Sequence, residues 1–114
     1  MTIQEIATQL ITLCEKGQFD EAYQTLFADT AKSIEPDGTV ADGLAAILKK
    51  SEAFKMDVIF AACEMGTPQF AGNYFSLVET FHSVIRQTGE KKQMSEIAVY
   101  KVANGKIVEE RFFY

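Results

Sequence analysis

The chain has 114 residues, which is enough for one domain of ordinary size and too few for two. Hydrophobic residues make up 47% and charged residues 24%, values typical of a globular protein, which exclude a disordered or low-complexity chain. The net charge is −5, with 16 acidic and 11 basic residues and no basic cluster, so we expect no nucleic-acid partner.

Several absences bear on location and cofactors. No run of about 18 apolar residues is present, so we expect no membrane span, and the first residues lack the pattern of a secretory signal. The two cysteines, Cys14 and Cys63, are isolated, and His82 is the only histidine, so no zinc site or other metal site is expected. The sequence predicts a cytoplasmic protein with reduced, buried thiols and no cofactor.

The first half of the chain is predicted to be helical. Thr2 and Glu5 form a capping box at the start of a first helix, and Gly17 is placed to end that helix in a left-handed turn. A second helix begins at Phe19, and the short connection makes the two helices antiparallel. After a brief strand at residues 31–35 and a turn at Pro36-Asp37-Gly38, a third helix is expected at residues 40–54.

The second half is rich in β-branched and aromatic residues. Four strands are predicted, separated by Gly66-Thr67-Pro68, Gly89 and Asn104-Gly105, at residues 57–64, 70–86, 93–102 and 106–114. Helices followed by a meander of antiparallel strands indicate an α+β domain with the helices on one face of the sheet. Long strands twist and curl, so we expect a cone with a hollow interior.

The Glu35-Pro36-Asp37-Gly38 turn, the order of the elements, and the ending from Ile97 through Asn104-Gly105 to Phe112-Phe113-Tyr114 resemble the SnoaL-like branch of the NTF2-like superfamily. The resemblance covers essentially the whole chain and implies one SnoaL-like domain over residues 1–114. It implies a cone-shaped fold in which three N-terminal helices pack on a strongly curved, mostly antiparallel sheet. Such proteins often form dimers through the outer sheet face, and they include cyclases, isomerases, dehydratases, epoxide hydrolases and binding modules. Because one fold supports all of these, the resemblance alone does not select an activity.

Alternation along the strand at residues 74–82 defines two faces of that strand. The more apolar set, which suits a partner subunit, consists of Phe75, Leu77, Glu79 and Phe81. The mixed set, which we assign to the pocket, consists of Tyr74, Ser76, Val78, Thr80 and His82. The reverse assignment stays open, because alternation defines the two sets but not their direction.

The last hairpin permits two registers. A two-residue Asn104-Gly105 loop pairs Ala103 with Lys106, whereas a three-residue loop with a bulged Gly105 pairs Val102 with Lys106. We favour the bulged loop, because the resemblance implies it. The side chains then expected on the inner face are Glu96, Ala98, Tyr100, Glu110, Phe112 and Tyr114.

Glu35 is the first candidate for chemistry. It stands where, by resemblance, the ketosteroid isomerase branch carries a catalytic carboxylate, just before a Pro-x-Gly turn. Partial desolvation at a pocket wall would raise the pKa of this carboxyl toward neutrality and suit it to proton transfer. The alternative is an exposed turn residue, which is common beside Pro-x-Gly. The isomerase's two oxyanion donors correspond to Leu10 and Ala98 here, so steroid isomerisation by that mechanism is not expected.

His82, Glu96 and Glu110 are the other candidates. An inward His82 would titrate near pH 7 and could contact Glu96, or it could lie in water at a strand end. Glu96 and Glu110 lie in apolar strands, so burial in one cavity would raise at least one pKa. Alternatively, Arg111, Lys101 or Lys106 neutralises them at the surface.

The sequence therefore predicts a small cofactor-independent enzyme that moves a proton on an apolar, carbonyl-bearing molecule. The catalytic candidates are Glu35, His82 and Glu110. The ligand-binding candidates are Tyr74, Ser76, Thr80, Glu96, Tyr100, Phe112 and Tyr114. The alternative is a non-catalytic ligand-binding or dimerisation module on the same fold. In either case we expect a homodimer, because the apolar face of residues 75–81 would otherwise contact water.

Overall fold

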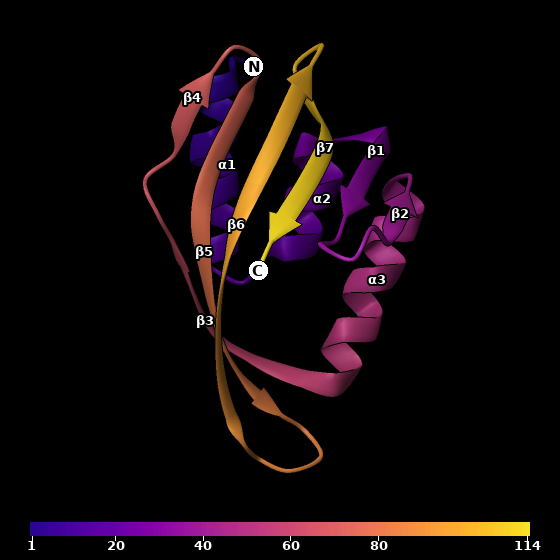
Figure 1. Ribbon diagram of the computed structural model, residues 1–114, viewed down its shortest axis with the longest axis vertical. Coiled ribbons are helices and arrows are strands. Elements are labelled where there is room, and N and C mark those ends of the chain that lie inside the picture. Colours follow the sequence, from indigo (N-terminus) through magenta and orange to yellow (C-terminus); the bar gives the residue numbers. More distant parts are fainter.

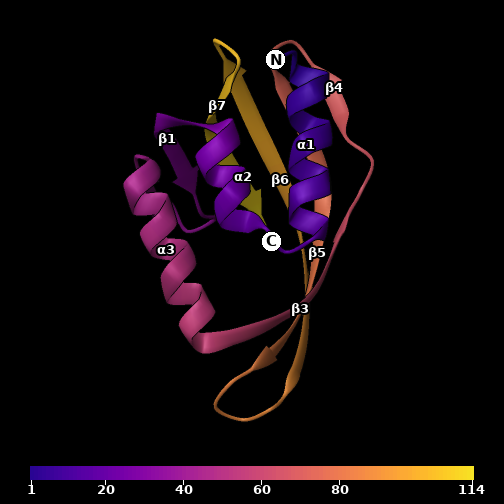
Figure 2. The same ribbon diagram turned by 180° about the vertical axis from the view of Figure 1, so that it is seen from behind.

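A computed structural model describes all 114 residues as three helices and a curled sheet (Figures 1 and 2). The helices are α1 (Ile3–Glu15), α2 (Phe19–Leu26) and α3 (Leu44–Asp57). The strands are β1 (Phe27–Ile34), β2 (Val40–Asp42), β3 (Val58–Met65), β4 (Gln69–Ala71), β5 (Tyr74–Ile85), β6 (Lys91–Ala103) and β7 (Lys106–Phe113). The sequence prediction of an α+β cone with helices on one side of the sheet is confirmed.

Helix α1 begins as the capping box predicts. The Thr2 hydroxyl accepts a hydrogen bond from the Glu5 backbone N–H at 3.1 Å, and the Glu5 carboxylate accepts one from the Thr2 N–H at 2.9 Å. The apolar stripe of α1 buries Ile6, Ala7 and Leu10 against the sheet. The helix thus forms one wall of the molecule, opposite the concave face of the sheet.

Helix α3 begins later than predicted. Val40–Asp42 forms strand β2, which pairs antiparallel with the end of β1, so the expectation of helix from residue 40 is wrong. Gly43 adopts φ +98°, and its N–H donates to the Ala31 carbonyl at 2.8 Å, which turns the chain into the helix. Pairing with an available sheet edge outweighed the helical spacing of the local sequence.

The sheet has the order β2-β1-β7-β6-β5-β3, and β4 also pairs with β5. Strand β1 is parallel to β7, and every other pairing is antiparallel. The predicted strand over residues 70–86 is divided into β4 and β5 by a turn at Gly72-Asn73. Strands β5 and β6 are the longest, and their hairpin extends beyond the helices (Figure 1).

The loop of the last hairpin is the two-residue form, so the favoured three-residue loop is wrong. Asn104 and Gly105 have φ values of +53° and +74°, and Ala103 pairs with Lys106. A register shift follows immediately, because Val102 pairs with Ile107 but Lys101 pairs with Glu109. This bulge restores the predicted face: Tyr100 lies opposite Glu110, and Ala98 lies opposite Phe112, all of them buried.

The face assigned to β5 is also wrong. Phe75, Leu77 and Glu79 are buried inside the molecule, whereas Tyr74 and Val78 on the other face are exposed. The predicted ligand-binding residues Tyr74, Ser76 and Thr80 therefore do not line the cavity. The cause is the hydrophobic effect: the helices cover the concave face of the sheet, so the more apolar set of β5 side chains is buried against them.

The type I′ loop makes a stability prediction. Replacing Gly105 with alanine should destabilise the fold by about 1 kcal/mol, because φ of +74° brings a Cβ atom too close to the following carbonyl. Asn104→Gly is the matched control and should be nearly neutral, since glycine accepts a positive φ. Urea denaturation measures both. Equal stability of Gly105→Ala and the parent chain would contradict the loop assignment.

Candidate functional site: a cavity with buried carboxyl groups

A cavity of about 630 Å³ lies between the concave face of the sheet and the helices. Of its 27 lining residues, 15 are hydrophobic, so a ligand there would be largely removed from water. The lining includes Leu10 and Cys14 from α1, Tyr23 from α2, Phe54 from α3, and Phe112 near the end of β7. The predicted hollow cone therefore contains a real cavity.

Three glutamate side chains reach into this cavity from adjacent strands. Glu79 (β5), Glu96 (β6) and Glu110 (β7) are only 4%, 9% and 1% exposed. Glu79 and Glu96 are direct cross-strand partners, and Glu110 lies opposite Tyr100. No basic side chain pairs with any of the three, so the expected alternative of neutralisation at the surface does not apply.

Glu79 and Glu96 form a coupled pair supported by Tyr100. The Tyr100 hydroxyl donates to Glu79 Oε2 at 2.5 Å, and the Tyr100 ring stacks on Phe75 with centroids 4.9 Å apart. Burial raises the pKa of Glu79 well above its ordinary value, and it raises the pKa of Glu96 to about 7. Because two neighbouring carboxylates in an apolar site repel one another, the pair holds a proton near neutral pH.

Glu110 is the most deeply buried of the three. Its Oε2 atom has no hydrogen-bond partner in the structure. Burial raises the pKa of Glu110 to about 7, while Ser33 and the charge of Lys50 act in the opposite direction. An unpartnered charged atom in a buried position is costly, so the surroundings of Oε2 favour the neutral, protonated form of Glu110.

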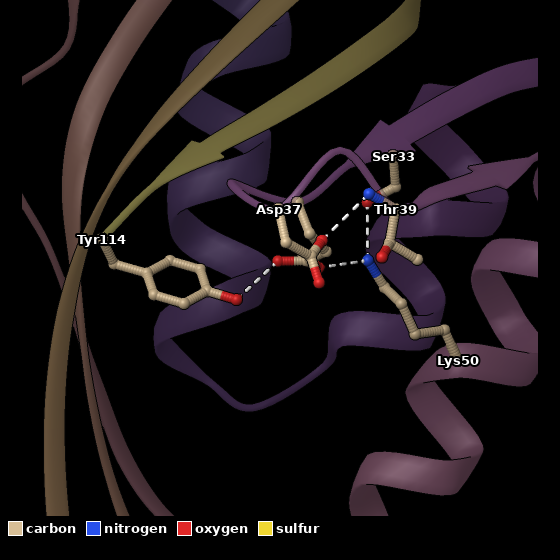
Figure 3. A network of polar contacts seen from close by, with 6 residues as sticks. Ser33, Asp37, Thr39, Lys50 and Tyr114 are labelled. Atoms are coloured by element: carbon tan, nitrogen blue, oxygen red, sulfur yellow. Dashed lines mark hydrogen bonds and ion pairs between the residues drawn. The ribbon is translucent and has the colours of Figure 1, made fainter.

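Glu35 lies at the edge of the cavity in a network of polar contacts (Figure 3). Lys50 Nζ, from α3, donates to Glu35 Oε1 at 2.7 Å and to Ser33 Oγ at 2.8 Å. The Tyr114 hydroxyl donates to Glu35 Oε2 at 2.7 Å, and this bond raises the pKa of Tyr114 to about 12. Both Glu35 oxygens are therefore occupied, and the network joins the end of β7, the turn after β1, and α3.

His82 lies at the rim of the cavity. Its Nε2 atom is 3.2 Å from Glu64 Oε2, and across the β5–β6 ladder it faces Gln93. The proposed contact with Glu96 is therefore wrong, because the register places Glu96 opposite Glu79. Leu10 and Ala98 are buried and offer no side-chain donor, as the sequence implies.

Two site residues were missed by the sequence analysis. Glu79 carried a signal, because it is the one charged residue in an otherwise apolar alternating set. No sequence signal indicated Lys50, which approaches Glu35 only because α3 packs beside β1 and β2 (Figure 1). Of the predicted residues, the structure brings Glu35, Glu96, Tyr100, Glu110, Phe112 and Tyr114 to the cavity together with His82.

Cys14 and Cys63 are free and buried, and burial raises the pKa of Cys63 to about 12, so neither is a reactive thiolate. No three His, Cys, Asp or Glu side chains are arranged to hold a metal ion. None of the three helices is long and apolar enough to cross a bilayer.

A curled sheet, three helices and an internal cavity define the class of cone-shaped α+β pocket proteins. The SnoaL-like domain family matches residues 1–114, and the chain belongs to that family. A candidate SnoaL-like polyketide cyclase from Mesorhizobium loti is 33% identical, with full coverage of both chains and a TM-score of 0.90. No curated protein sequence matches.

Two more distant structures share the fold. A candidate polyketide cyclase from Xanthomonas campestris pv. campestris is 14% identical, with a TM-score of 0.80 over 98% of this chain and 89% of the other. A hypothetical protein from Catenulispora acidiphila, with a ketosteroid isomerase-like fold and solved with trimethylamine, is 16% identical. Its TM-score is 0.81 over 99% of this chain and 87% of its own. At these identities the likeness is one of fold.

The raised pKa of Glu110 predicts a pH-dependent stability. Its folded pKa of about 7 lies above the ordinary 4.5, so the folded state binds the proton more tightly, and stability falls as pH rises between these values. Between pH 5 and pH 8 this group removes about 2 kcal/mol of unfolding free energy. Between pH 5 and pH 8, the unfolding free energy of Glu110→Gln should therefore fall by about 2 kcal/mol less than that of the parent chain.

Urea denaturation at both pH values measures the effect. Glu109→Gln is the matched control, because Glu109 is the preceding residue, is partly exposed and lies 4.0 Å from Arg111. That control should keep the pH dependence of the parent chain. An unchanged pH dependence in Glu110→Gln would show that Glu110 titrates as an ordinary carboxyl.

Proposed function

We propose that this protein binds an apolar, carbonyl-bearing small molecule in its cavity and transfers a proton on it without a cofactor. The observation that carries the proposal is the placement of three glutamates without a basic partner in an apolar cavity. The pKa values of Glu96 and Glu110 are raised to about 7 there, which suits proton exchange at neutral pH.

Glu96 is the proposed base. Its carboxylate accepts a proton from the carbon next to the carbonyl: the C–H bond breaks, an O–H bond forms on Glu96, and the electron pair moves to the carbonyl oxygen as an enolate. The electron pair then returns from oxygen to carbon, the carbonyl re-forms, and Glu96 gives the proton back to the same carbon or, where the ligand carries a conjugated double bond, to the far carbon of that bond. Glu79 lies directly opposite Glu96 on the neighbouring strand and accepts a hydrogen bond from Tyr100, so Glu79 and Tyr100 act as positioning residues.

Glu110 is the proposed donor to the enolate oxygen. Its protonated form carries an O–H group, and its free Oε2 atom has no protein partner to give up. A fixed donor in a water-poor site stabilises developing negative charge strongly. Glu110 thereby replaces the donors that Leu10 and Ala98 do not supply.

Glu35 and His82 have supporting roles in this proposal. The two Glu35 oxygens are bound by Lys50 and Tyr114, so Glu35 positions the lysine at the cavity edge and its charge helps to raise the pKa of Glu96. His82, at the rim beside Glu64, orients a ligand rather than abstracting its proton.

Deuterium exchange tests the proposed base. α-Tetralone in D2O should exchange its α-hydrogens faster with the protein present, followed by proton NMR. Glu96→Gln should slow the catalysed exchange by about 100-fold, because the amide cannot accept the proton. Glu109→Gln should not change it. If Glu96→Gln exchanges at the parent rate while tetralone is bound, Glu96 is not the base.

A non-catalytic ligand-binding module is the second candidate function. The apolar residues at positions 10 and 98 favour it, because the donors of the isomerase branch are missing there. Carbon-13 NMR titration of the glutamate carboxyl groups distinguishes the candidates. A value near 7 for Glu96 supports proton transfer, and an ordinary value supports the module.

We further propose a homodimer formed by two copies of this chain through the outer sheet face. Val78 and Ile97 are cross-strand partners on the two longest strands, and each is 48% exposed. Phe113 on β7 is 50% exposed. Apolar side chains that are contiguous across central strands favour burial against a second copy.

The free, buried Cys14 and Cys63 support a reducing, cytoplasmic location.

A charge placed on this face should disrupt the dimer. Val78→Glu should convert the dimer to a monomer, because desolvating an unpaired carboxylate opposes association. Val40→Glu is the matched control, since Val40 is 46% exposed but lies on the edge strand β2. Sedimentation velocity measures the mass. A parent chain that is monomeric, or a dimer unaffected by Val78→Glu, contradicts the proposed interface.

A further inference from the structure

Basic side chains gather at the cavity although the chain as a whole carries a net charge of −5. The carboxyl groups of Glu79, Glu96 and Glu110 are buried on the concave face of the sheet. The basic lining residues are instead half-buried or exposed, and come from α3 and the β5–β6 hairpin: Lys50, Lys55, His82, Arg86 and Lys92. The cavity is therefore acidic at its buried wall and basic at its rim.

Most of these basic groups already have an acidic partner. Lys50 pairs with Glu35 at 2.7 Å, and His82 contacts Glu64 at 3.2 Å. Lys55 pairs with Asp20 at 2.6 Å and with Glu52 at 3.3 Å. Arg86 has no carboxylate within 4.0 Å, and neither does Lys92 on the facing strand.

Arg86 is nevertheless held in place. Its Nε–H donates to the Lys55 carbonyl at 3.0 Å, and its backbone N–H donates to the Asp57 carbonyl at 3.0 Å. Both acceptors belong to the last turn of α3, so one bond fixes the side chain and the other fixes the main chain. The terminal guanidinium nitrogens remain available, and that planar group binds a carboxylate in a bidentate way.

We infer that the ligand is an apolar keto acid whose carboxylate binds Arg86 at the rim while its carbonyl reaches Glu96 and Glu110 inside. This inference rests on the proposed function and names its substrate class. The orientation follows from charge: the buried wall offers a ligand anion only acidic groups, whereas the unpaired guanidinium at the rim attracts one. Lys92 adds positive charge on the same side of the cavity.

Calorimetric titration with 8-benzoyloctanoate and with its neutral amide tests the inference, because the two ligands differ only in the anionic group and the chain separates the ketone from the carboxylate, as Arg86 and Glu96 are separated along the strands. The parent chain should bind the acid about fivefold to tenfold more tightly than the amide at low salt, and added salt should reduce the difference. Arg86→Gln should remove the preference and leave binding of the amide unchanged.

Arg111→Gln is the matched control. Arg111 is the only other arginine, is exposed on β7 and does not line the cavity. It should retain the full preference for the acid. Three results would each overturn the inference. The parent chain could bind the acid and the amide equally, Arg86→Gln could lose the same affinity for both ligands, or neither ligand could bind at millimolar concentration.

The outcomes separate this inference from the proposed function. If tetralone exchange depends on Glu96 but the acid is not preferred, the keto-acid inference fails and proton transfer stands. If Arg86 gives the preference but exchange does not occur, the protein binds an apolar anion without the proposed chemistry.

Discussion

The removal of three carboxyl groups from water on the concave face of the sheet is the constraint on which the site depends. A strand alternates its side chains, so Glu79, Glu96 and Glu110 face inward because their neighbours Phe75, Ala98 and Phe112 do. Burial disfavours the charged form of each acid and raises its pKa, which allows a carboxyl group to hold or release a proton near neutral pH. The same burial makes the folded protein less stable as pH rises.

The edge of the cavity follows the opposite rule. There the acidic and basic groups are partly hydrated and paired with one another, as in the Glu35–Lys50 contact and the Asp20–Lys55 contact. These contacts also connect α3 to the turn after β1 and to α2. The position of α3 beside the cavity therefore depends on polar contacts as much as on its apolar residues, of which only Ile47 is fully buried.

Local signals in the sequence predicted much of the fold and part of the site. The capping box at Thr2 and the turn residues marked where elements begin and end, and the acidic residues within apolar strands indicated Glu96 and Glu110 as inward groups. The residues predicted to face inward on β6 and β7 were correct although the predicted loop length was wrong. A bulge beside Val102 shifts the register by one residue and so offsets the shorter loop. Glu35 was found by its turn, but its partner Lys50 was not, since no local pattern connects a helix residue to a strand end.

The sequence by itself determined the types of most elements, the two side-chain sets of each strand and the family to which the chain belongs. These depend on backbone geometry and on periodic burial, which are local properties. Only the tertiary structure decided which set of β5 faces the helices, that Glu79 meets Glu96, and that Arg86 is left without an acidic partner. Those outcomes depend on the packing of segments far apart in the chain, where the free energy of burial selects one direction from two that the alternating pattern allows equally.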